Sequence, residues 1–167
     1  MSESILNNKR ILAVDDEPDV LETLEELLDG FDGLIFDSAT DYETGYQLIR
    51  SWTYDAVILD IMGVRGFDLL NASVHLGFPT VMLTAHALTP EALKKSIKLG
   101  AVTFLPKDKM SDLRSFLEDV VLGEGKPVWQ KFFEKLGAYF NKHFGPDWVE
   151  RDQFLKEFKE ELMGQAK

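Results

Sequence analysis

The chain has 167 residues, of which 45% are hydrophobic, with no cysteine and a formal net charge of −11. This is the composition of one globular domain, or of one domain with an appendage, and the lack of cysteine excludes disulfides and thiolate zinc sites. The negative charge argues against nucleic acid as a partner. No apolar stretch is long enough for a signal peptide or a membrane span, so we expect a cytoplasmic protein without membrane contact.

Five short apolar runs alternate with amphipathic stretches over the first 123 residues. The runs are rich in β-branched or aromatic residues, as buried parallel strands are; they cover 10–16, 33–39, 56–60, 80–84 and 101–105. Helical patterns follow them at 18–30, 41–52, 66–77, 89–100 and 108–123. Five such units predict an α/β fold: a doubly wound, flavodoxin-like, five-stranded parallel sheet in the order 2-1-3-4-5.

The character of the chain changes after Gly123. The Gly/Pro-containing stretch GEGKP precedes a segment that holds 9 of the 19 aromatic residues, many at helical spacing. Residues 1–123 contain 10 Lys/Arg and 21 Asp/Glu, whereas residues 124–167 contain 8 of each. We therefore predict two parts, a domain at 1–123 and an α-helical hairpin at 124–167.

Two amphipathic helices cannot bury both of their apolar faces alone, so the hairpin needs another surface. It has three options: to pack back on the first domain, to form a homodimer, or to present a docking face to another protein. Its charge balance shows no basic helix of the kind that binds DNA.

Five polar side chains follow strands of the predicted sheet. Asp15 and Asp16 follow the first strand, and Asp60 ends the third. In this strand order the winding reverses between those two strands, which places the working crevice at their carboxyl ends. Three carboxylates there predict a site for Mg²⁺ or Mn²⁺.

Thr84 ends the fourth strand, and Lys107 follows the fifth. A hydroxyl and an ammonium beside a metal and a carboxylate form a site for a phosphoryl group, with Asp60 as the nucleophile. Taken alone, an acidic pair such as Asp15-Asp16 is as well explained by a solvated strand end and the start of a helix. The alignment of all five residues favours the phosphoryl site.

These motifs together resemble the receiver domain of two-component response regulators. They are the acidic pair, the Asp-Ile-Met of residues 60–62, Thr-Ala at 84–85 and GAVTFLPK at 100–107, and the resemblance spans residues 8–122. It implies that Asp60 accepts a phosphoryl group from a sensor histidine kinase, a phosphotransfer protein or a small phosphodonor. Self-phosphorylation and slow autodephosphorylation would then be the only catalysis, so the protein is not expected to be an enzyme in the usual sense.

The resemblance also implies roles for individual residues. Asp16, Asp60 and the backbone carbonyl of Met62 would bind Mg²⁺ directly, and Asp15 largely through water. Thr84 and Lys107 would contact the phosphoryl oxygens.

The same resemblance implies a switch. Thr84 would move toward the phosphoryl group and Phe104 would turn inward, which repacks the face formed by the fourth helix, fifth strand and fifth helix. That face would then control a downstream protein partner or self-association. Met62 and His86 would tune the lifetime of the acyl phosphate through water access.

The sequence departs from the family pattern at three places. Gly63 stands where proline commonly follows methionine, and this predicts a looser loop. Pro106-Lys107 replaces the usual Lys-Pro order, and Phe104 lacks the hydroxyl of the common tyrosine. Two alternatives stay open: a pseudo-receiver that binds partners without phosphotransfer, and a metal-dependent phosphohydrolase of the haloacid dehalogenase type, which would require Asp-x-Asp after the first strand.

Overall fold

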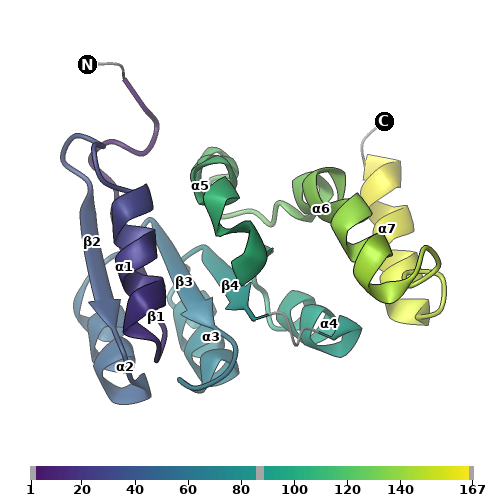
Figure 1. Ribbon diagram of the computed structural model, residues 1–167, viewed down its shortest axis with the longest axis horizontal. Coiled ribbons are helices and arrows are strands. Elements are labelled where there is room, and N and C mark those ends of the chain that lie inside the picture. Colours follow the sequence, from purple (N-terminus) through teal and green to yellow (C-terminus); the bar gives the residue numbers. More distant parts are fainter. Residues whose placement is uncertain (1–2, 86–88, 166–167) are drawn as a thin grey trace.

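The structure is a computed structural model, and it describes residues 3–85 and 89–165 (Figure 1). Its centre is one parallel sheet in the order β2-β1-β3-β4-β5, which confirms the predicted fold class. The strands are β1 (Arg10–Val14), β2 (Ile35–Ala39), β3 (Ala56–Asp60), β4 (Thr80–Thr84) and β5 (Thr103–Pro106).

Helices connect the strands and cover both faces of the sheet. They are α1 (Pro18–Leu27), α2 (Tyr42–Ser51), α3 (Gly66–His75), α4 (Pro90–Lys98), a 3₁₀ segment η1 (Lys107–Asp112), α5 (Leu113–Leu122), α6 (Trp129–Phe144) and α7 (Gln153–Gln165). Right-handed crossovers in this strand order place α1 on one face and α2, α3 and α4 on the other; α5 packs beside α1. Among the described residues, no helix combines the length and the apolar character needed to cross a bilayer.

Two expectations about these elements were wrong. β2 was predicted to be a buried strand, but only Ala39 of its residues is buried, and Ile35 is 48% exposed. The last helical pattern of the first domain was expected to begin at residue 108. Instead η1 comes first, and the α-helix begins at Leu113. β3 and β4, by contrast, are buried throughout, as predicted.

The C-terminal hairpin packs against α4, β5 and α5 (Figure 1). The indole N–H of Trp129 donates to the carbonyl oxygen of Ala101 at 3.1 Å, and the amide of Val128 donates to the carbonyl of Val102 at 2.8 Å. Of the three options for the hairpin, packing on the first domain is therefore the one found.

Aromatic side chains fill this contact. Four apolar residues of α6 are buried in the same core as the sheet: Trp129, Phe132, Leu136 and Phe140. Trp148 lies in the turn before α7 rather than in the helix, and it is buried against Phe133 and Phe140. The hairpin therefore completes the apolar core on this side of the molecule.

Replacing Trp129 with phenylalanine tests how much this contact stabilises the fold. Trp129→Phe leaves the buried carbonyl of Ala101 without its donor, so we expect the free energy of unfolding to fall by roughly 1–3 kcal/mol in urea titrations. Trp52 is half exposed, and Trp52→Phe is the matched control, with an expected change below about 0.5 kcal/mol. Equal small effects of both substitutions would contradict a docked hairpin.

Candidate functional site

Three carboxylates gather at the carboxyl ends of β1 and β3. Val14 and Leu59 are partners in the parallel pairing, so the next residues, Asp15 and Asp60, are neighbours. One carboxylate oxygen each of Asp15, Asp16 and Asp60 lies within 4.8 Å of the others. Asp15 is 1% exposed and Asp60 is 4% exposed, whereas Asp16 is exposed. The predicted acidic cluster is therefore present, and we call it the acidic pocket.

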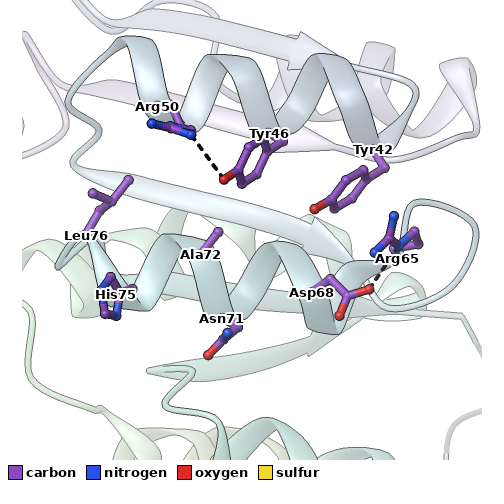
Figure 2. Close-up of a pocket in the computed structure, with 9 residues that line it drawn as sticks. All are labelled: Tyr42, Tyr46, Arg50, Arg65, Asp68, Asn71, Ala72, His75 and Leu76. Carbon is purple, nitrogen blue, oxygen red and sulfur yellow. Dashed lines mark hydrogen bonds and ion pairs between the residues drawn. The ribbon is translucent and has the colours of Figure 1, made fainter.

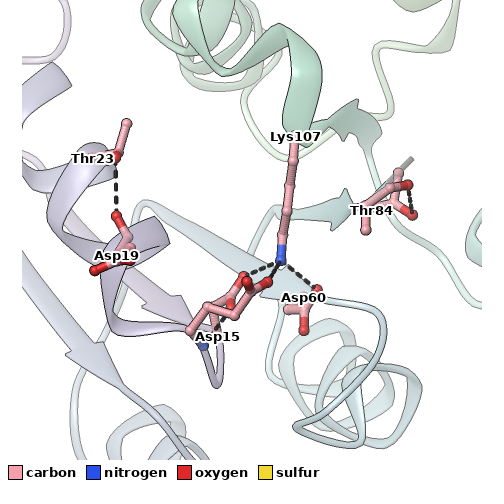
Figure 3. A network of polar contacts seen from close by, with 8 residues as sticks. Asp15, Asp19, Thr23, Asp60, Thr84 and Lys107 are labelled. Carbon is pink, nitrogen blue, oxygen red and sulfur yellow. Dashed lines mark hydrogen bonds and ion pairs between the residues drawn. The ribbon is translucent and has the colours of Figure 1, made fainter. Parts of the chain in front are cut away.

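Lys107 extends from the start of η1 into the acidic pocket (Figure 3). Its Nζ lies 2.9 Å from Oδ2 of Asp15 and 3.3 Å from Oδ1 of Asp60. It also donates a hydrogen bond of 2.9 Å to Oε1 of Glu17. The Pro106-Lys107 order thus still brings the ammonium to the carboxylates, as the sequence predicted.

Glu17 is a residue that the sequence analysis missed. Its side chain contacts Lys107, and its backbone N–H donates to Oδ1 of Asp15 at 2.8 Å, which fixes that carboxylate. The available signal was its position directly after the acidic pair, where the chain turns into α1. Because Glu17 is largely exposed, it forms a solvent-facing side of the pocket.

Burial and charge set the protonation of the pocket. Burial, together with the nearby charge of Asp15, raises the pKa of Asp60 to about 6. Burial also raises the pKa of Asp15, although the Glu17 amide and Lys107 oppose this. For Lys107 burial alone would lower the pKa, but the hydrogen bond to Glu17 and the ion pair with Asp15 outweigh it and hold the pKa above its usual value. Lys107 therefore stays cationic.

The donors of the pocket fit a hard divalent cation. One ammonium faces the carboxylates of Asp15, Asp16, Glu17 and Asp60, which leaves an excess of negative charge. Within the described part of the chain, Oδ2 of Asp15 is buried and has no hydrogen-bond donor; its contact with Lys107, at 2.9 Å, is an ion pair. Carboxylate oxygens are the ligands that Mg²⁺ prefers. The side chain of Met62 is 73% exposed, and ligation by its carbonyl stays a prediction.

The loop after β3 passes close to these carboxylates. Gly63 has φ +86°, and a Cβ built there would lie 2.4 Å from Oδ2 of Asp16. Gly66 begins α3, and a Cβ on it would lie 2.0 Å from the carbonyl oxygen of Asp60. A proline cannot adopt this φ, so the departure from the family pattern at Gly63 is a requirement of this loop.

Thr84 and Phe104 lie outside the polar network. Thr84 is buried at the end of β4, but its Oγ1 donates to the carbonyl of Ala85 at 3.3 Å (Figure 3). Phe104 is fully buried on β5. Their switch roles stay predictions, and His86 lies outside the described residues.

A separate groove of about 570 Å³ lies between α2 and α3 (Figure 2). Its arginines already have partners: Arg65 forms an ion pair with Asp68 at 2.9 Å, and Arg50 contacts the hydroxyl of Tyr46 at 3.4 Å. None of the predicted site residues that the structure describes lines this groove. The acidic pocket is therefore the better candidate for the functional site.

Comparison with known proteins concerns the part of the chain that forms the sheet. The family model of the response regulator receiver domain matches residues 11–118. The probable transcriptional regulatory protein SilR of Salmonella typhimurium is 38% identical over 104 residues, which is 59% of this chain and 44% of SilR. The transcriptional regulatory protein CusR of Escherichia coli K12 is 36% identical over 102 residues, again 59% of this chain and 44% of the relative. The match thus spans less than half the length of these two regulators.

A third relative bears on the partner. The DNA-binding response regulator MtrA of Mycolicibacterium smegmatis is 32% identical over 119 residues, 65% of this chain and 50% of MtrA. The names of these relatives conflict with the prediction that nucleic acid is not a partner, and we do not maintain it.

Solved structures share the fold. A putative response regulator from Chloroflexus aurantiacus has a TM-score of 0.60 and 26% identity, and the alignment covers 68% of this chain and 98% of that one. A receiver domain protein from Clostridium thermocellum has a TM-score of 0.60 and 25% identity, with 68% and 94% covered. In both, almost the whole of the solved chain is aligned, while a third of this chain has no counterpart.

The raised pKa of Asp60 predicts that ionisation of this carboxyl lowers the free energy of unfolding as the pH rises. In the folded chain the carboxyl holds its proton up to about pH 6, whereas in the unfolded chain it loses the proton near pH 4. Stability is therefore lost as the pH rises through this interval. In the metal-free protein, Asp60→Asn should raise the free energy of unfolding by about 1–3 kcal/mol above pH 7, because asparagine never ionises.

The gain in the free energy of unfolding of Asp60→Asn should disappear as the pH falls from 6 to 4. Denaturant titrations in the presence of a chelator will measure it. Asp29→Asn, at an exposed position, is the control and should show no such trend. A gain that is the same at every pH would contradict a buried carboxyl at Asp60.

Proposed function

The chain belongs to the response regulator receiver family, and from this premise we propose that it is the phosphoacceptor of a two-component phosphorelay. Asp60 accepts a phosphoryl group from a sensor histidine kinase or a phosphotransfer protein in an Mg²⁺-dependent reaction. The observation that carries the proposal is the nearly buried carboxylate of Asp60 with Lys107 and two further aspartates beside it. Response regulators are mainly signalling proteins, and we propose no turnover of other substrates.

The transfer is a nucleophilic displacement at phosphorus. An oxygen of ionised Asp60 forms the new P–O bond while the P–N bond to the donor imidazole breaks, and the electron pair of that bond stays on the imidazole nitrogen. The ammonium of Lys107, 3.3 Å from Oδ1 of Asp60, is placed to neutralise a phosphoryl oxygen. To do so it must exchange Glu17, its exposed partner, for that oxygen.

Asp15, Asp16 and Asp60 would hold the metal, together with the carbonyl of Met62. Bound Mg²⁺ would neutralise the carboxylates and the negative charge of the transferring group. The hydrogen bond from the Glu17 amide fixes Oδ1 of Asp15. The other oxygen, Oδ2, which pairs with the ammonium of Lys107 at 2.9 Å, would contact the cation or its water. Because Gly63 has no side chain, the loop after β3 can approach the carboxylate of Asp16 without a steric clash.

The switch follows from the new charge at one fixed point. Phosphorylation adds about −1.5 to −2 charges. Thr84 would turn its hydroxyl from Ala85 to a phosphoryl oxygen, and Phe104 would turn inward. These movements would shift the equilibrium between two conformations of the face formed by α4, β5 and α5. Met62 and His86 would set the lifetime of the acyl phosphate. The division into a receiver at 1–123 and a helical extension at 124–167 is part of this proposal.

Acetyl phosphate tests the proposal directly. In the presence of Mg²⁺ the intact protein should gain one phosphoryl group by mass spectrometry, Asp60→Asn should gain none, and the exposed-site control Asp29→Asn should react like the wild type. A chelator should abolish the reaction. A chain that stays unmodified while binding partners would instead be a pseudo-receiver, and steady turnover of added phosphomonoesters would indicate a phosphohydrolase.

Gly63 provides a test of the metal site with a close control. Gly63→Ala would place a methyl against Asp16, whereas Gly77→Ala would meet nothing within 4 Å, although Gly77 has a similar φ of +84°. Both substitutions strain the backbone, but only Gly63→Ala displaces a carboxylate. We expect the affinity for Mg²⁺ to fall roughly tenfold in Gly63→Ala and to be unchanged in Gly77→Ala, as measured by calorimetric titration. Equal affinities would exclude Asp16 as a ligand.

A further inference from the structure

Helix α6 contacts one residue on each side of Lys107. Phe104, three residues before Lys107, packs edge-on against Phe132 and Phe140, with ring centroids 6.2 and 6.5 Å away. Asp108, the residue after Lys107, accepts a 3.0 Å hydrogen bond from the hydroxyl of Tyr139. One helix of the hairpin therefore holds the β5–η1 segment on both sides of the lysine that enters the acidic pocket.

The sheet connects the same segment to Thr84. In the pairing of β4 with β5, Thr84 lies opposite Pro106, and Met82 lies opposite Phe104. Because alternate residues of a strand point to the same face, Thr84 and Phe104 share one face on neighbouring strands. A movement of Thr84 toward Asp60 would leave space on this face. Phe104, fully buried there, could fill that space only by leaving the aromatic rings of α6.

Further contacts keep the hairpin on this surface. Lys94 of α4 forms a 2.8 Å ion pair with Asp152, next to the start of α7. Lys135 of α6 pairs with Asp119 of α5. Lys98 lies over the ring of Phe154, 4.8 Å from its centroid. Two ion pairs and one cation–π contact therefore join the hairpin to α4 or α5, in addition to its aromatic contact with β5.

We propose that the α6–α7 hairpin is an intramolecular inhibitor of the switch. Docked on α4, β5 and α5, it keeps the ring of Phe104 turned toward α6, against Phe132 and Phe140. It thereby disfavours the conformation with Phe104 turned toward Thr84, which phosphorylation of Asp60 requires. This inference rests on the proposed function. Because coupling between two sites is reciprocal, phosphorylation must weaken hairpin docking by the same factor as docking weakens occupation of Asp60.

The docked hairpin also decides which partners can bind. It covers the α4–β5–α5 surface, so a downstream protein or a second copy of the chain cannot use that surface until the hairpin leaves. Release would expose the aromatic side chains of α6 and the switch face together. The partner is thus a competitor of the hairpin, and phosphorylation at Asp60 favours the partner.

Beryllofluoride with Mg²⁺, a mimic of the phosphoryl group, tests this coupling in the full-length chain. Two variants weaken the contact to the β5–η1 segment. Phe132→Leu replaces the aromatic ring that packs against Phe104 with a smaller aliphatic side chain. Tyr139→Phe removes only the hydroxyl that donates to Asp108. We expect Phe132→Leu to bind beryllofluoride roughly five- to tenfold more tightly than the wild type, and Tyr139→Phe to change in the same direction. Tyr46→Phe removes a hydroxyl that accepts a hydrogen bond from Arg50 on α2. It is the matched control and should bind like the wild type.

Hydrogen exchange measures the reverse effect. Beryllofluoride should speed amide exchange in α6 of the wild type, with no change in α6 of Asp60→Asn. Binding at Asp60 with unchanged α6 exchange and with variant affinities equal to or weaker than the wild type would overturn the inhibitor and leave the proposed function intact. No binding to the wild type, or equal binding to Asp60→Asn, would overturn the proposed function itself.

Discussion

The site depends on one ammonium held among buried carboxylates. Nζ of Lys107 lies within 3.3 Å of both Asp15 and Asp60, which are almost fully buried at the ends of adjacent strands. Burying two like charges this close is costly without a compensating charge. Lys107 supplies part of that compensation, but it also forms an ion pair with Glu17. The remaining negative charge favours a divalent cation. The bound cation, together with Lys107, would then offset the negative charge of an incoming phosphoryl group.

Much of this arrangement follows from sequence pattern. Five apolar runs of strand length, separated by helical patterns, predicted the sheet and its order, because right-handed crossovers leave few topologies. Residues that end neighbouring parallel strands must meet at one edge of the sheet. The meeting of Asp15, Asp16 and Asp60 could therefore be predicted, as could the presence of Lys107. β2 shows the limit of the pattern, since an apolar run does not reveal how far the neighbouring helices will cover its side chains.

What could not be predicted depends on three-dimensional contacts. The role of Glu17 requires the turn that places its amide on Asp15 and its carboxylate on Lys107. The need for glycine at 63 arises from the distance between two loops, which no periodicity encodes. Aromatic spacing identified a helical hairpin but left its partner surface open. The contacts of Phe132, Phe140 and Tyr139 with the segment around Lys107, which spacing does not show, connect the hairpin to the acidic pocket.

A crystal structure of the full chain with Mg²⁺ and beryllofluoride tests the central claim most directly. The account predicts beryllium bonded to a carboxylate oxygen of Asp60, the metal among the three aspartates, and Lys107 moved from Glu17 to a fluorine of the ligand. Lys107 still bonded to Glu17, with neither metal nor beryllofluoride at the aspartates, would contradict it.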